Sequence, residues 1–166
     1  TGNSNRSHTD QYFSYVYYGS NNSDYNEATV TQTGNSNSSG VYQRGDYNGA
    51  AIDQIGDQNY SYANSYGNYN GIDVDQVGNG NHSTVSQNGD WNTATVAQTG
   101  MSNNSTVNQS GDYNDADVSS TGDYNNSWIA QTGDGNDADA TQVGNSNQSD
   151  IDQYGDMNTA STTQTG

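Results

Sequence analysis

The chain has 166 residues, of which 27% are hydrophobic, and it carries a formal net charge of −17 at pH 7. Because 19 acidic residues stand against two basic ones, we expect no nucleic-acid partner and no anionic membrane partner. The absence of cysteine excludes disulfide and thiolate chemistry, and no run of 18 or more apolar residues is present to insert into a membrane.

A low hydrophobic content combined with a high net charge is, by itself, typical of a disordered chain. Two features favour an ordered structure instead. Proline is absent, although disordered chains are often rich in it and β-ladders exclude it. The residues also recur with a strict period, which disorder does not require.

Residues 1–22 form the divergent part of the chain, which we interpret as an aromatic-rich N-terminal repeat or cap. Its first half matches the frame of the later repeat at Gly2, Asn5, Ser7, Thr9 and Gln11. In residues 12–19, YFSYVYYG, aromatic residues replace the glycine and amide positions, but their alternation still favours a strand. Two interpretations stay open for this stretch: a decayed strand that caps or docks, or a partly ordered, adhesive terminus.

Residues 23–166 repeat an eleven-residue unit thirteen times without slippage. A typical unit has a glycine, an asparagine three residues later, an apolar residue four beyond that, and a glutamine two further on. The glycines are Gly34, Gly45, Gly56, Gly67, Gly78, Gly89, Gly100, Gly111, Gly122, Gly133, Gly144 and Gly155. The asparagines are Asn26, Asn37, Asn48, Asn59, Asn70, Asn81, Asn92, Asn103, Asn114, Asn125, Asn136, Asn147 and Asn158. The glutamines are Gln32, Gln43, Gln54, Gln76, Gln87, Gln98, Gln109, Gln131, Gln142, Gln153 and Gln164, with Ser65 and Ser120 as exceptions.

The spacing of these positions predicts strands. Residues two apart face the same side of a strand, whereas a helix would scatter them. Glycine next to Asp or Asn indicates a tight turn, because these residues tolerate positive φ. The residue two after each Asn alternates between mostly alanine and serine, which doubles the period to 22 residues. We therefore predict an all-β fold, a two-sheet parallel β-solenoid whose 22-residue coils are built as strand, turn, strand, turn.

The amides are expected to form ladders inside this stack. Coils about 4.8 Å apart place each residue above the equivalent residue of the next coil. A buried amide costs a few kcal/mol when it is unpaired, but in a ladder it donates to one neighbour and accepts from the other. The asparagines and glutamines therefore give the register and the glycines give the turns. Because the repeat runs in register to Gly166 without a cap, we also expect head-to-tail polymerisation into a cross-β filament.

The repeat resembles the curlin repeat, whose pattern is Ser-x5-Gln-x-Gly-x-Gly-Asn-x-Ala-x3-Gln. Its second part is found at Gln43, Gly45, Asn48, Ala50 and Gln54, at Gln87, Gly89, Asn92, Ala94 and Gln98, and at Gln109, Gly111, Asn114 and Ala116. The chain departs from the pattern in two ways. Asn stands at the leading Ser position, as at Asn37 and Asn81, and the second Gly is often Tyr or Trp.

The resemblance implies a curli-like major subunit, a structural protein of an extracellular functional amyloid fibre that serves biofilm matrix and adhesion. It implies that the main partner is the chain itself, with a nucleator subunit and an outer-membrane secretion channel. The alternative is a monomeric, capped β-solenoid that acts as an adhesin or an ice-binding module. Against ice binding, the outward position of Thr29 and Thr95 also holds Asp73, Asp117 and Asp139, which interrupts a flat threonine array.

We predict no enzyme, no cofactor and no metal, since no nucleophile, base and orienting group come together. Two surface features each have more than one interpretation. Acidic pairs at Asp73/Asp75, Asp115/Asp117, Asp137/Asp139 and Asp150/Asp152 fit a Ca²⁺ site or pH switch, or a solvated face that prevents sideways pairing. A row of aromatic residues at Tyr25, Tyr47, Tyr69, Trp91 and Tyr113 fits lateral contact, carbohydrate or dye binding, or simple shielding of the turns.

Overall fold

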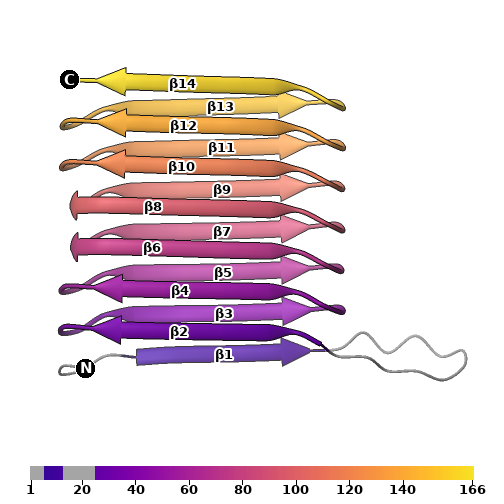
Figure 1. The fold of residues 1–166 in the computed structure, drawn as a ribbon, viewed down its shortest axis with the longest axis horizontal. Coiled ribbons are helices and arrows are strands. Elements are labelled where there is room, and N and C mark those ends of the chain that lie inside the picture. Colours follow the sequence, from indigo (N-terminus) through magenta and orange to yellow (C-terminus); the bar gives the residue numbers. More distant parts are fainter. Residues whose placement is uncertain (1–5, 13–24) are drawn as a thin grey trace, which may run out of the picture.

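The computed structural model describes residues 6–12 and 25–166, and in them the chain winds into a stack of short strands (Figure 1). The strands are β1 (Arg6–Tyr12), β2 (Glu27–Thr33), β3 (Ser38–Arg44), β4 (Gly49–Ile55), β5 (Tyr60–Tyr66), β6 (Gly71–Asn79), β7 (His82–Asn88), β8 (Thr93–Met101), β9 (Asn104–Ser110), β10 (Asp115–Thr121), β11 (Asn126–Thr132), β12 (Asp137–Val143), β13 (Gln148–Tyr154) and β14 (Thr159–Thr165). No helix in these ranges is long and apolar enough to cross a membrane.

The strands divide between two seven-stranded sheets that face each other. The odd-numbered strands, β1 to β13, form one sheet and the even-numbered strands, β2 to β14, form the other; we call them the odd sheet and the even sheet. All pairs are parallel, and from β2 onward each residue pairs with the residue 22 positions later, as Val74 does with Val96. The predicted two-sheet parallel β-solenoid with 22-residue coils is therefore confirmed.

Strand β1 joins the odd sheet with a different offset. Arg6 pairs with Ser38 and Gln11 with Gln43, so partners lie 32 residues apart, ten more than the 22 found elsewhere. The backbone register still places Ser7 beside Ser39, in line with the frame of the repeat. The ten additional residues fall in the connection between β1 and β2. Most of the aromatic stretch 12–19 belongs to this connection, and residues 13–24 lie outside the described residues, so its role stays a prediction.

The core is a narrow layer between the two sheets. Burial alternates along each strand, as in β10, where every second residue faces the interior. The apolar column of the repeat is buried, with Ile52, Val74, Val96 and Ile129 at 0% exposure. Alanine and serine two residues before it complete the layer. These side chains are small, so the space between the sheets is thin, and a sequence with few hydrophobic residues can fill it.

Candidate functional site

The glutamines form a ladder that runs along the stack and also links the two sheets. The Nε2 of Gln54 donates to the Oε1 of Gln76, and Gln76 donates in turn to Gln98, each at 2.8 Å. The same Nε2 of Gln76 donates across the core to the backbone carbonyl of Tyr60 at 3.0 Å. One amide group therefore uses one hydrogen to join coils and the other to join sheets, and these amides are fully buried.

The two exceptions to the glutamine pattern keep polar partners. Where Ser120 follows Gln98 in the even sheet, the Nε2 of Gln98 donates instead to the Oγ of Ser105, at 2.8 Å. The Oγ of Ser120 then donates to the Oε1 of Gln142 at 3.2 Å. In the odd sheet Ser65 donates in the same way to Gln87, at 3.4 Å. The ladder is interrupted at these coils, but the glutamines on either side of each serine, Gln43, Gln87, Gln98 and Gln142, keep hydrogen-bond partners.

The asparagines form a second ladder at the turns. The Nδ2 of Asn92 donates to the Oδ1 of Asn70 in the preceding coil at 3.1 Å and to the carbonyl of Gly111 in the following coil at 2.8 Å. Its Oδ1 accepts from the backbone N–H of Asn114 at 3.0 Å. Asn92 is 0% exposed, so each of these bonds is made away from water. The side chain thus takes the place of backbone pairing where the chain turns.

The predicted ladder residues are nearly all inside the stack. Those of the inner coils are buried, and those nearest its two ends are partly exposed: Asn26, Gln32, Asn147, Asn158 and Gln164. The glycines have φ between +96° and +132°, as expected for turns. The structure adds a second requirement, since a Cβ on Gly89 would overlap the carbonyl oxygen of Gly111 in the next coil. Glycine is therefore needed both for its conformation and for the close approach of backbones.

The position after each glycine, which the sequence indicated only as part of a turn, forms a third hydrogen-bonded column. There an Asp or Asn accepts a hydrogen bond from the backbone N–H of the equivalent residue one coil earlier, as Asp112 accepts from Asp90 at 2.7 Å. The signal was available, because Asp or Asn follows every glycine of the turns except Gly100. At that exception Met101 supplies no acceptor, and β6 and β8 extend by backbone pairing of Asn79 with Met101.

The aromatic row forms a continuous stack on one edge. Ring centroids lie 4.8 Å apart between Tyr47 and Tyr69, 4.1 Å between Tyr69 and Trp91, and 6.2 Å between Trp91 and Tyr113. The planes are nearly parallel, so most ring faces are covered by neighbouring rings and the edges meet solvent. These residues have φ near +60°, a conformation that costs a side chain about 1–3 kcal/mol. Stacking of about 0.5–1.5 kcal/mol for each pair offsets part of that cost.

Three of the four acidic pairs lie on the outer face of the even sheet, and the fourth, Asp150/Asp152, lies on β13 of the odd sheet. Asp115 pairs with Asp137 and Asp117 with Asp139 in neighbouring strands. Burial, together with the charges of Asp117 and Asp137, raises the pKa of Asp115 above its ordinary value. In residues 6–12 and 25–166, no group of three or more His, Cys, Asp or Glu is arranged to hold a metal ion. The geometry therefore gives columns of mutually repelling carboxylates.

Comparison with protein families finds the Curlin associated repeat at residues 24–56, 67–100, 78–111, 92–122, 111–144 and 133–166. Neither the comparison with curated proteins nor that with solved structures gives a match. The matched segments cover most of the chain but do not include residues 57–66, which contain β5 with its outward tyrosines. The chain belongs to the family of proteins built from the Curlin associated repeat.

Proposed function

We propose that this chain is the structural subunit of an extracellular functional amyloid fibre, which grows by stacking the coils of one chain on those of another. The observation that carries the proposal is the identity of successive coil-to-coil contacts. From β2 to β14 the same positions pair at an offset of 22 residues, and the amide hydrogen bonds repeat from coil to coil except at Ser65 and Ser120. A coil is therefore complementary to another copy of itself.

The hydrogen bonds also have a direction, which favours head-to-tail growth. In each glutamine pair the Nε2 belongs to the earlier coil and the Oε1 to the later one, as between Gln87 and Gln109. At the glutamine positions one face of a coil therefore presents donors and the opposite face presents acceptors, and at the asparagine positions the direction is reversed, as when Asn92 donates to Asn70 of the preceding coil. Two like faces would place donor against donor, whereas a head-to-tail addition repeats the contacts inside the chain. Strand addition of this kind is templated by the exposed sheet edges.

The biological setting is carried over from the family. Curlin-repeat proteins are structural and generally extracellular, which favours a fibre of the biofilm matrix with a role in adhesion. From the same family resemblance we also propose a nucleator subunit and an outer-membrane secretion channel as partners. The ice-binding alternative is less well supported. In the register of the even sheet, the column that begins with Thr29 continues through Ala51, Asp73 and Thr95 and contains no flat threonine array.

The test is assembly of the purified, refolded chain, followed by electron microscopy and size-exclusion chromatography. We expect unbranched filaments at the expense of monomer. Replacing Asn92 and Gln98 by leucine should slow growth, because both amides belong to the buried ladders, whereas Asn88→Leu on the exposed face is a matched control. A monodisperse monomer that forms no filaments over days at high concentration contradicts the proposal.

A further inference from the structure

The two outer faces of the solenoid differ in charge. The four Arg and His residues of the chain, Arg6, His8, Arg44 and His82, lie on strands of the odd sheet. The described outer face of the even sheet carries aspartates and Glu27 but no basic side chain. The strands of the odd sheet also carry Asp10 on β1 and Asp150 and Asp152 on β13, so the complementarity is local. Around Arg44 on β3, the odd face of one filament is electrostatically suited to the acidic even face of a second filament.

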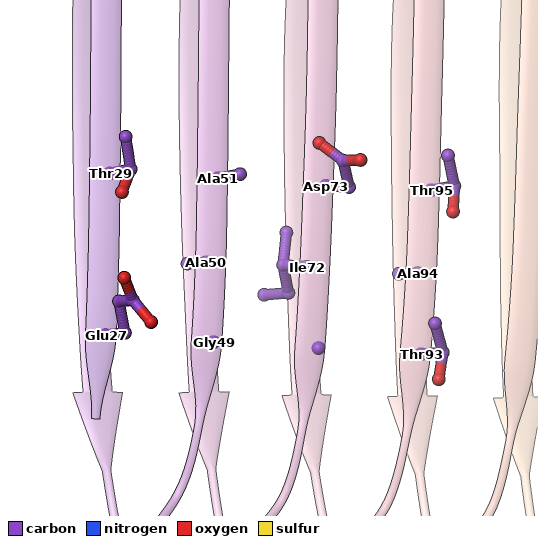
Figure 2. Close-up of a pocket in the computed structure, with 11 residues that line it drawn as sticks. Glu27, Thr29, Gly49, Ala50, Ala51, Ile72, Asp73, Thr93, Ala94 and Thr95 are labelled. Carbon is purple, nitrogen blue, oxygen red and sulfur yellow. The ribbon is translucent and has the colours of Figure 1, made fainter. Parts of the chain in front are cut away.

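The even sheet has a hollow on its outer face near the N-terminal end of the stack. Figure 2 shows Gly49 in a row between the larger side chains of Glu27 and Thr93, and Ala51 in the next row between Thr29 and Asp73. Gly71, which pairs with Gly49, continues the floor of the hollow. Since neither glycine carries a side chain, the sheet surface is lower there than in the rest of the column.

The odd sheet has a protrusion at the same level of the stack. The guanidinium of Arg44 on β3 lies over the ring of Tyr66 on β5, 5.0 Å from its centroid. Tyr66 is 46% exposed, although it stands on a sheet face and not in a turn. At the other end of β5, Tyr60 is also exposed. Large aromatic side chains here project from a surface otherwise built mostly of small polar residues.

The strand directions bring the protrusion opposite the hollow. The odd and even strands run in opposite directions, so odd strands end at the edge of the stack where even strands begin (Figure 1). When a second copy is displaced perpendicular to the sheets without rotation, Arg44 and Tyr66, which end β3 and β5, face the first residues of the even strands. Those residues are Glu27, Gly49 and Gly71.

The same displacement also matches the opposite edge of the sheets. Tyr60 begins β5, so it faces the column formed by Ile55 and Val77 toward the ends of β4 and β6. These two residues are apolar side chains exposed on the even sheet, at 52% and 43%. A single translation therefore places the ring of Tyr66 over a hollow, a guanidinium beside a carboxylate, and a second aromatic ring, that of Tyr60, on exposed aliphatic side chains.

We propose that the partner of these two faces is a second copy of this chain: filaments pair side by side in parallel, odd sheet on even sheet, with Arg44 and Tyr66 seated over Gly49 and Gly71. The inference rests on the proposed filament. The contact joins two different surfaces, so it does not close on itself and lets further filaments add as a ribbon. Facing sheets pack about 10 Å apart, a distance that side chains of this size bridge.

The hollow provides a clean test, because a Cβ on Gly49 or Gly71 meets no atom within 4 Å and neither glycine has a positive φ. The solenoid itself tolerates a side chain there. We expect the double variant Gly49→Tyr and Gly71→Tyr to grow filaments at the wild-type rate but to remain single. Thr159→Tyr, at the same position on β14 and away from the hollow, is the matched control and should still pair.

An exchange of charges between the two faces tests whether Arg44 of one filament meets Glu27 of the other. Arg44→Glu or Glu27→Arg alone should reduce pairing, and the two together should restore it, since the opposite charges again face each other. Electron microscopy counts paired filaments, and mass per length halves when pairs separate. Wild-type filaments that stay single, or tyrosine-filled variants that pair like wild type, overturn this inference alone. Absence of filaments from the wild-type chain contradicts the proposed function as well.

Discussion

The replacement Asn92→Leu probes the ladder at a single buried position. Leucine is close to asparagine in size but makes none of its hydrogen bonds. The change removes the bonds to Asn70 and Gly111, and it removes the acceptor used by the backbone N–H of Asn114. Two main-chain groups, the Gly111 carbonyl and the Asn114 N–H, lose a partner in the interior at about 1–3 kcal/mol each. We therefore expect the free energy of unfolding to fall by about 2–6 kcal/mol.

The measurement is guanidinium unfolding of the refolded chain followed by circular dichroism, compared between Asn92→Leu and Asn88→Leu. Asn88 lies in the same coil but faces solvent, so its replacement should change the free energy of unfolding by no more than about 0.5 kcal/mol. Equal unfolding midpoints for the two variants would refute the reasoning, because the asparagine at the turn would then contribute nothing as a buried amide.

Three further predictions concern the turn column, the turn glycines and the acidic residues of the even sheet. Met101→Asp should raise the free energy of unfolding by about 1 kcal/mol, since it supplies the acceptor missing from the turn column; an unchanged midpoint argues against that column. Gly111→Ala should prevent native stacking, because its Cβ overlaps the Gly133 carbonyl; wild-type growth kinetics would contradict this. Burial and like charges raise the pKa of Asp75 and Asp115, so their contribution to stability is fully present below about pH 4 and is lost as pH rises through the raised values. Between pH 4 and 7, the free energy of unfolding should fall less for the Asp75→Asn, Asp115→Asn double variant than for wild type. An equal fall in the two proteins would show that these aspartates do not cause the pH dependence.

The strands and the 22-residue coil could be predicted because both depend on periods that the sequence repeats many times. Val74 and Val96 occupy equivalent positions in the sequence and are Cα partners in the structure. Burial of the amides followed from the same alternation. A spacing of two residues places Asn, Ala or Ser, an apolar residue and Gln on one face, and only stacking can pair that many buried amides.

Other features depend on distances between coils that no local pattern encodes. The need for glycine at Gly89 comes from the approach of the Gly111 carbonyl, which belongs to the next coil. The left-handed backbone conformation of Trp91 could not be predicted, because a bulky residue rarely adopts it. A clue existed in Gly80 and Gly135, which occupy the same position in other turns and have φ of +66° and +67°. The extension of β6 and β8 likewise occurs where Met101 has no side-chain acceptor for the backbone N–H of Asn79.

Mass per length of single filaments tests the central claim, that the fibre is a stack of solenoid coils. Two seven-stranded sheets give seven layers for a chain of 17.7 kDa, and with layers about 4.8 Å apart the account predicts about 5 kDa per nm. An in-register amyloid that contributes one chain to every layer would give about 37 kDa per nm. Scanning transmission electron microscopy separates these values directly. The lower value supports the stacked solenoid, and the higher value contradicts it.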